Sequence, residues 1–324
     1  MSKTSTEWVR HALNGPTMGT RWSAVFHTAP EFGVTPLQAA LQDAVERVDR
    51  QMSTWRADSD LMRINRAAVG ELLEVPEELA SVLAVGLEVG RASGGAFDIG
   101  MGDAVQAWGF GQGAANEADI RRALATMRRP AHEVVELIAG GLVKREALML
   151  DLNGVAKGYA VDRLAQVLRE FGIDAALVGI DGEMRAFGLR PDGEAWAIAV
   201  EAPEAGVRAP HSILSLHDGA VATSGDYRHT VTVQSHRLSH TMDPRRGAPL
   251  ASSPASVTVV APSCAQADAW ATALMVLGPE AGMRLAARQG LSVLFLMRDG
   301  KGGIAPVASG LFREESPGSP SRIA

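Results

Sequence analysis

The sequence predicts an α+β fold in which mostly antiparallel sheets are flanked by helices. Two Asp-Gly pairs, Asp181-Gly182 and Asp218-Gly219, each separate two short apolar segments, which is the pattern of an antiparallel hairpin with a tight turn. Apolar residues recur at helical spacing in the first part of the chain and at the spacing of short strands from Glu133 onward. We therefore expect strands that pair locally and antiparallel, with helices beside them.

The N-terminal elements follow from apolar spacing and capping signals. Residues 22–26 predict a strand. Thr35-Pro36 predicts a helix start, with Thr35 as the N-cap, Pro36 as the first helical residue and Gln38 in the capping-box position. Two further helices are expected at 76–92 and 117–127.

The later elements alternate between short strands and amphipathic helices. Helices are expected at 154–171, 265–277 and 280–288. Strands are expected at 134–138, 142–145, 148–152, 176–180, 183–187, 196–200, 213–216, 220–223, 256–260 and 291–297.

No internal repeat and no linker divides the 324 residues. We expect a loose N-terminal arm over residues 1–14 and one domain over residues 15–312. The Glu-, Ser- and Pro-rich residues 313–324 predict a disordered tail.

Composition excludes several classes of protein. The formal charge of −6 and the absence of a basic stripe argue against a nucleic-acid partner. No segment has the apolar length of a membrane span or of a secretory leader, so we expect a cytoplasmic protein as written, or a periplasmic one should the true start lie upstream. Cys264 is the single cysteine, which excludes an internal disulfide and a multi-cysteine metal site.

Asp268 and Thr272 lie four residues apart in an apolar helical segment, so they share one helix face. Burying such an oxygen-only pair is costly unless something is bound there, and hard cations such as Mg²⁺ take these ligands. The alternative is structural, because Thr can bond to its own helix backbone and Asp268 can be an ordinary first-turn acid.

The segment Asp151-Leu-Asn-Gly-Val-Ala-Lys-Gly-Tyr159 begins a predicted helix. A helix start offers free N–H groups to a phosphate, Gly154 allows a close approach, and Lys157 adds a positive charge. The alternative is that Asp151 or Asn153 only caps the helix while Lys157 is solvated. His240 is a further titratable candidate, although a lone His is more often structural.

Eight short segments in a fixed order resemble the FAD:protein FMN transferases, the ApbE-like family, over roughly residues 15–297. They are Pro16-Thr-Met-Gly-Thr20, Met52-Ser-Thr-Trp55 with Asp58-Ser59, Gly95-Ala-Phe-Asp98, Asp151 to Tyr159, Gly182-Glu183, Ala222-Thr-Ser-Gly-Asp-Tyr-Arg228, His240-Thr-Met-Asp-Pro-Arg245 and Ala267-Asp-Ala-Trp-Ala-Thr272. The resemblance implies a T-fold-like architecture with an FAD cleft between two intimately packed halves.

The resemblance also implies the site residues. Asp268 and Thr272 would bind Mg²⁺ through their side chains, and Gly154 and Ala271 through their main chain. Trp55 stands where the family more often carries Tyr, so it keeps a stacking face but offers only an N–H donor. The residues implied to contact FAD are Met18, Trp55, Ala96, Phe97, Asp98, Asp151, Lys157 and Met242.

The implied activity splits FAD at its pyrophosphate, passes FMN to a Thr or Ser hydroxyl of an acceptor flavoprotein and releases AMP. The cation and Lys157 would stabilise the developing negative charge, and His240 would act as the base that activates the hydroxyl. Three alternatives stay open at this point: an FAD pyrophosphatase in which water replaces the hydroxyl, a non-catalytic flavin-binding or assembly protein, and a structural module with no ligand.

Overall fold

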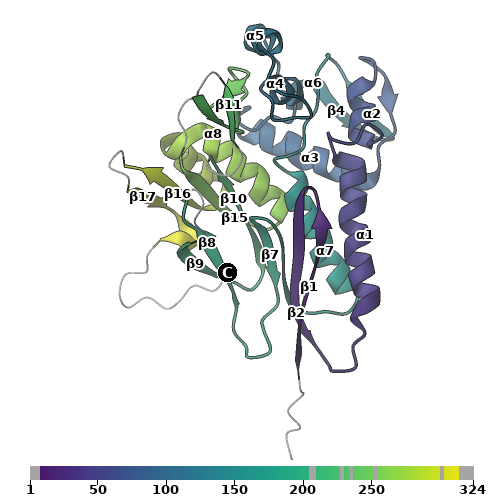
Figure 1. The fold of residues 1–324 in the computed structure, drawn as a ribbon, viewed down its shortest axis with the longest axis vertical. Helices are drawn as coiled ribbons and strands as arrows, with labels where there is room; N and C mark the ends of the chain where they lie inside the picture. Colours follow the sequence, from purple (N-terminus) through teal and green to yellow (C-terminus); the bar gives the residue numbers. More distant parts are fainter. Residues whose placement is uncertain are drawn as a thin grey trace, which may run out of the picture.

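An eight-stranded sheet, in which all neighbouring strands are antiparallel, forms the centre of the molecule (Figure 1). The computed structural model describes residues 8–203, 209–226, 230–233, 236–250, 254–299 and 303–313. In spatial order the strands are β1 (Val9–Thr17), β2 (Thr20–Thr28), β6 (Ala176–Ile180), β7 (Glu183–Phe187), β10 (Gly219–Gly225), β15 (Ser256–Ala261), β16 (Ser292–Arg298) and β17 (Ile304–Ala308). The predicted fold class is confirmed.

Smaller sheets surround the large one. They are β3 (Leu72–Leu73) with β5 (Gly141–Lys144) and β4 (Val135–Ile138), β8 (Trp196–Glu201) with β9 (Pro210–Leu216), β11 (Thr230–Val233) with β12 (His236–Ser239), and β13 (Met242–Asp243) with β14 (Ala248–Pro249).

Long helices cover one face of the large sheet. The helices of the described chain are α1 (Val34–Met52), α2 (Asp60–Arg66), α3 (Glu77–Ala92), α4 (Gly102–Ala107), α5 (Glu117–Ala125), α6 (Ala131–Val134), α7 (Ala156–Glu170) and α8 (Cys264–Gln289), with a 3₁₀ turn at Gly310–Phe312. Apolar side chains of α1, α3, α7 and α8 share one core with the inward residues of β2, β6, β10, β15 and β16. The β8–β9 pair packs on the opposite face of the sheet.

The expected loose arm is wrong over residues 9–14, because these residues belong to β1, which pairs with β2 along its whole length. Gly15 and Pro16 are unusual in a strand, so the sequence does not predict one here. The strand is stabilised by its hydrogen bonds with β2. Residues 1–7 of the arm and 314–324 of the predicted tail lie outside the described residues.

The start of α1 also differs from the prediction. The helix begins at Val34 after Gly33, and no side chain caps it, so Thr35 and Gln38 do not form a capping box. Pro36 is tolerated because it stands in the first turn, where main-chain N–H groups have no partner within the helix.

The strand expected at 148–152 is absent apart from one parallel bridge between Met101 and Met149. The side chain of Asn65 takes the place of a neighbouring strand: its amide donates to Leu150 O (2.9 Å), and its oxygen accepts from Leu150 N (2.7 Å). No pattern of apolar residues could reveal that exchange.

One of the two predicted hairpins is confirmed. Asp181-Gly182 joins the paired strands β6 and β7, whereas the chain after Asp218 leaves the β8–β9 pair and enters the large sheet, so β9 and β10 are not partners. The two helices expected at the end of the chain are present within α8, which breaks at Gly278 (φ 71°, ψ 175°) just before Pro279. None of the helices in the described residues is long and apolar enough to span a membrane.

Candidate functional site

The site forms where α7 and α8 cross. A Cβ atom at Gly158 would collide with the main-chain carbonyl of Cys264, so glycine is what allows the two helices to approach this closely. The N–H of Gly158 donates to Asp268 Oδ2 (3.1 Å). From α7, the carboxylate of Asp162 accepts from the main-chain N–H groups of Cys264 (2.9 Å) and Ala265 (3.0 Å), which otherwise lack helical partners. These contacts fix the first turns of α8 against the start of α7.

Three oxygen-bearing residues predicted to bind a cation meet at this crossing. The Asp268 side chain is buried, with only 5% of the residue exposed. A Cβ at Gly154 would stand 3.2 Å from Thr272 Oγ1, so the main chain of the 154 turn lies directly beside that hydroxyl. The structure therefore brings Asp268 and Thr272 of α8 close to the turn at Gly154, which is necessary if all three residues are to bind one cation.

The donor set fits a hard cation. A carboxylate, a hydroxyl and a main-chain carbonyl are the oxygen ligands that Mg²⁺ takes, and the space beside Gly154 is one that any side chain would fill. Within the described residues no group of three or more His, Cys, Asp and Glu side chains is placed to hold a metal. Ala271 is completely buried inside α8, so only its main-chain carbonyl could take part.

The charges of the site lie close together. Lys157 Nζ donates to Glu183 Oε1 at 2.8 Å. Burial, together with the nearby charge of Glu183, raises the pKa of Asp268 well above its ordinary value, although Lys157 and the Gly158 N–H oppose the rise. Burial lowers the pKa of Lys157, but Glu183 and Asp268 outweigh it and leave that pKa above its ordinary value. Lys157 therefore stays positively charged, and a cation bound beside Asp268 would favour the charged form of its carboxyl group.

The turn 96–98 lies beside the start of α7. The Phe97 ring would be 3.0 Å from a Cβ at Gly154, and Ile99 O accepts a hydrogen bond from Asp151 N (2.8 Å). Asp98 Oδ1 accepts from the N–H groups of Gly100 (2.8 Å) and Ala131 (3.0 Å), so this carboxylate holds the turn.

Burial perturbs both carboxyl groups of this region. It raises the pKa of Asp151 to about 6, against the opposing hydrogen bond from Asn153 N, and it raises the pKa of Asp98 against the two main-chain donors. Acids perturbed in this way cluster at functional sites. The turn 96–98 and Asp151 thus lie near the proposed cation ligands Gly154, Asp268 and Thr272. The contacts of Ala96, Phe97, Asp98 and Asp151 with FAD stay predictions.

Met18 and Trp55 occupy turns on other elements. Met18 adopts a left-handed conformation (φ 46°) at the tip of the β1–β2 hairpin, and Trp55 follows α1 with 61% of its surface exposed. An exposed indole is free to stack on a planar ring. A pocket shared by these two residues stays a prediction.

The segment with His240 and Met242 rests on α4 and α5. Met242 is only 7% exposed and packs with Met101, Ala104, Ala107 and Ala123, which leaves its main chain as the part that could face a ligand. His240 is half-buried at the bend before β13. Its role as a base stays a prediction.

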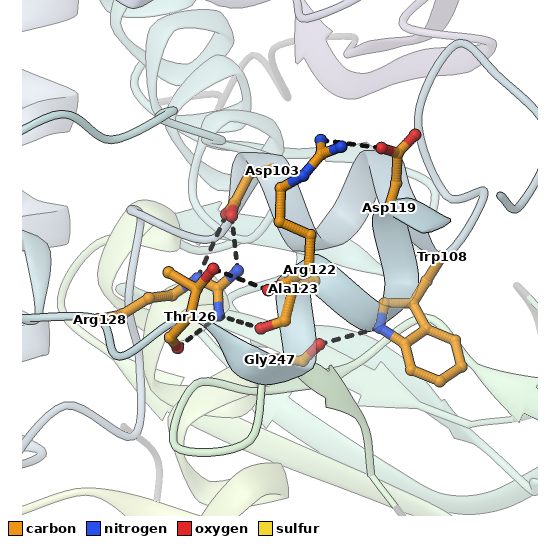
Figure 2. A network of polar contacts seen from close by, with 8 residues as sticks. All are labelled: Asp103, Trp108, Asp119, Arg122, Ala123, Thr126, Arg128 and Gly247. Atoms are coloured by element: carbon orange, nitrogen blue, oxygen red, sulfur yellow. Dashed lines mark hydrogen bonds and ion pairs between the residues drawn. The ribbon is translucent and has the colours of Figure 1, made fainter. Parts of the chain in front are cut away.

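Figure 2 shows how the β13–β14 turn is anchored to α4 and α5. Trp108 Nε1 donates to Gly247 O (2.9 Å). Arg128 Nη1 donates to Ala123 O (2.6 Å), and its Nη2 binds Asp103 Oδ2 (2.5 Å). Gly247 has a φ of 61°, and a Cβ there would lie 2.6 Å from Ala123 O. The turn that follows His240 and Met242 is therefore held tightly.

A cavity of about 290 Å³ opens between α4 and α5, but none of the predicted site residues lines it. Its polar walls include Asp103 and Asp119, which are already paired with Arg128 and Arg122. The oxygen donors at the α7–α8 crossing, rather than cavity size, make that crossing the candidate site.

Sequence reasoning assigned no role to three residues of the crossing. Glu183 pairs with Lys157, Asp162 holds the start of α8 and binds Arg185, and Ser224 Oγ lies 3.2 Å from Thr272 Oγ1. A signal existed for Glu183, a charged residue directly after a tight turn. For Asp162 there was none, because an acid on an amphipathic helix is ordinarily solvated.

Comparison with known proteins agrees with this architecture. The ApbE family profile matches residues 18–295. Two proteins named FAD:protein FMN transferase, from Vibrio cholerae and Klebsiella pneumoniae, are 36% and 33% identical over 300 and 297 residues. Each alignment covers 90% of this chain, and 88% and 85% of the respective relative.

A solved structure is similar along almost the whole chain. The apo flavinyl transferase ApbE of Pseudomonas stutzeri superimposes with a TM-score of 0.82 at 35% identity, covering 93% of this chain and 95% of that one. With the profile match, the relatives and this shared fold in agreement, the chain belongs to the ApbE family.

Proposed function

We propose that this protein is an FAD:protein FMN transferase. It cleaves FAD, attaches FMN through a phosphoester to a Thr or Ser of an acceptor flavoprotein, releases AMP and depends on Mg²⁺. The observation that carries the proposal is the meeting of Gly154, Asp268 and Thr272 beside the Lys157 ammonium. The names of the similar proteins support the same activity.

The reaction exchanges one phosphoester oxygen for another. The hydroxyl oxygen of the acceptor attacks the phosphorus that stays with FMN, the bond from that phosphorus to the AMP oxygen breaks, and AMP leaves with the bridging oxygen. Bound by Asp268, Thr272 and the Gly154 carbonyl, with Ala271 as a further main-chain candidate, Mg²⁺ would neutralise charge on the pyrophosphate. Negative charge grows on the phosphate oxygens, which is where a fixed cation has most effect.

Lys157 and the first turn of α7 supply the protein's own share of this stabilisation. Lys157 belongs to that first turn, and the positive end of the helix dipole there also favours an anion. The N–H groups of Ala156 and Gly158 are already bonded to Leu152 O and Asp268 Oδ2. The turn 96–98 and Asp151 form the adjoining wall for FAD. Trp55 offers a ring face for stacking, and Met18 and the Met242 main chain complete the proposed contacts.

His240 is the proposed base, because the unperturbed imidazole pKa of about 6.5 suits proton removal near neutral pH. The proton of the acceptor hydroxyl moves to the imidazole as the new phosphoester forms.

Incubation of the purified protein with FAD, Mg²⁺ and candidate acceptor flavoproteins, scored by covalent flavin fluorescence in denaturing gels, tests the proposed function. Fluorescence is expected on the acceptor only when the protein, FAD and Mg²⁺ are all present. The same mixture without acceptor measures how fast FAD is converted to FMN and AMP. Rapid conversion with no labelled acceptor would identify a pyrophosphatase instead, and FAD binding with neither product would identify a binding protein.

A further inference from the structure

A buried ion pair joins the start of β7 to the start of α7. Glu183 is the first residue of β7 and is only 3% exposed, and its Oε1 accepts from Lys157 Nζ at 2.8 Å. The Lys157 side chain keeps 29% of its surface exposed. The carboxylate therefore lies inside the protein, while part of the Lys157 side chain remains exposed.

The turn before Glu183 fixes where its carboxylate points. Ile180 and Glu183 are the last paired residues of the β6–β7 hairpin, and Asp181 between them has a φ of 53°, which Asp tolerates in tight turns. Glu183 is therefore placed by a paired strand of the large sheet rather than by an unpaired loop.

Burying the Glu183 carboxylate is energetically unfavourable, and its place at the start of β7 does not explain why an acid is there. Its second oxygen, Oε2, is buried and finds no hydrogen-bond partner among the described residues. Asp268 is a second buried carboxylate nearby, so two acids face a single Lys157. A buried carboxylate that is only half satisfied is costly to stability, and an apolar residue at the start of a strand would avoid that cost.

We propose that Glu183 is a positioning residue for catalysis, which holds the Lys157 ammonium in place beside the metal-binding residues. An ammonium has three N–H donors. One of them is committed to Glu183, which sets the direction of the other two and leaves them for oxygens of the FAD pyrophosphate. This role rests on the proposed function, because it acts through the charge that Lys157 supplies to the reaction.

Glu183→Gln keeps the size of the side chain and an oxygen acceptor but removes the charge that holds Lys157. We expect kcat of FMN transfer to fall about ten- to a hundredfold, since misplacement of a charged group by about 1 Å has effects of this size. KM for FAD should change far less, because FAD still meets its other contacts. Glu78→Gln is the matched control. Glu78 of α3 pairs with Arg163 of α7, the helix that also carries Lys157, at 3.0 Å and outside the site. This control should transfer FMN at the parent rate.

A double-mutant cycle separates positioning from simple structural damage. If Glu183 acts through Lys157, adding Glu183→Gln to Lys157→Ala causes no further loss of kcat. The midpoint of thermal unfolding, measured without FAD or metal, is the second readout. Lys157→Ala leaves two buried carboxylates without their cation, so the double variant should melt at a higher temperature than Lys157→Ala alone.

The outcomes distinguish this inference from the proposed function. A slow Lys157→Ala together with a parent-rate Glu183→Gln would overturn the positioning role alone. Losses of kcat that multiply in the double variant would also overturn it. Transfer at the parent rate by Lys157→Ala would instead remove Lys157 from the proposed mechanism, whatever the melting temperatures show.

Discussion

Individual side chains at the α7–α8 crossing hold charge that the interior of a protein disfavours. Asp268 is buried with one hydrogen bond from Gly158, and Glu183 is buried with one from Lys157. Burial of a carboxylate normally drives it toward the neutral form. A cation bound between Asp268, Thr272 and Gly154, as proposed, would reverse that tendency for Asp268.

The effect of burying a single carboxyl group on stability can be tested at Asp98. Burial raises its pKa above the ordinary value of 3.8 in the folded protein. The folded state therefore binds the proton more tightly than the unfolded chain, and the free energy of unfolding decreases as the pH rises from about 4 through the folded pKa. Asp98→Asn keeps an oxygen acceptor for Gly100 N and Ala131 N but removes this titration.

Urea unfolding of both proteins between pH 4 and pH 7 measures the effect. The stability of the parent relative to Asp98→Asn should decline as the pH rises through this window and then level off. A difference that does not change with pH would show that the carboxyl group is not destabilised by burial.

At the scale of elements, short helices support the segment with His240. The α4–α5 pair contacts the β13–β14 turn through Trp108 and Gly247, and Met242 packs on the same helices (Figure 2). The sequence places these parts more than a hundred residues apart, so only the fold reveals that they form one unit. A rigid support of this kind is what a proton-accepting side chain needs to hold its geometry.

Trp108→Phe removes the indole N–H that holds Gly247 O and keeps an aromatic ring. We expect a loss of about 1 kcal/mol in stability, the typical net value of one hydrogen bond. Main-chain amides at 241–250 should exchange with deuterium faster, while those of α8 keep their protection. The exposed Trp8→Phe serves as the control for ring size. Unchanged exchange at 241–250 would mean that this hydrogen bond does not anchor the turn.

The sequence predicts local elements better than it predicts how they meet. The hairpin at Asp181-Gly182 and the break at Gly278 are visible because turn residues have specific backbone requirements. The strand expected at 148–152 fails because its partner is the Asn65 side chain, and β1 is missed because its pairing comes from β2. Long-range partners of this kind leave no periodic pattern in the chain.

For the whole molecule, the order of strands assembles the site. Strands β6, β7, β10 and β15 are neighbours in the large sheet, and α7 and α8 pack together on one face of it. This arrangement carries Glu183, the start of α7 and the first turns of α8 to one place. The spacing of Asp268 and Thr272 predicted their shared helix face. Their meeting with Gly154 depends on the close crossing at Gly158, which no single segment encodes.

The Mg²⁺ dependence of FMN transfer in Asp268→Asn tests the central claim most directly. The amide is the same size as the carboxylate and keeps an oxygen for Gly158 N, so the fold and its melting temperature should be preserved. At Mg²⁺ concentrations that saturate the parent, the variant should transfer FMN about a hundredfold more slowly or worse, because a bound metal contributes several kcal/mol to such reactions. A variant that matches the parent rate at the same Mg²⁺ concentration would contradict the account.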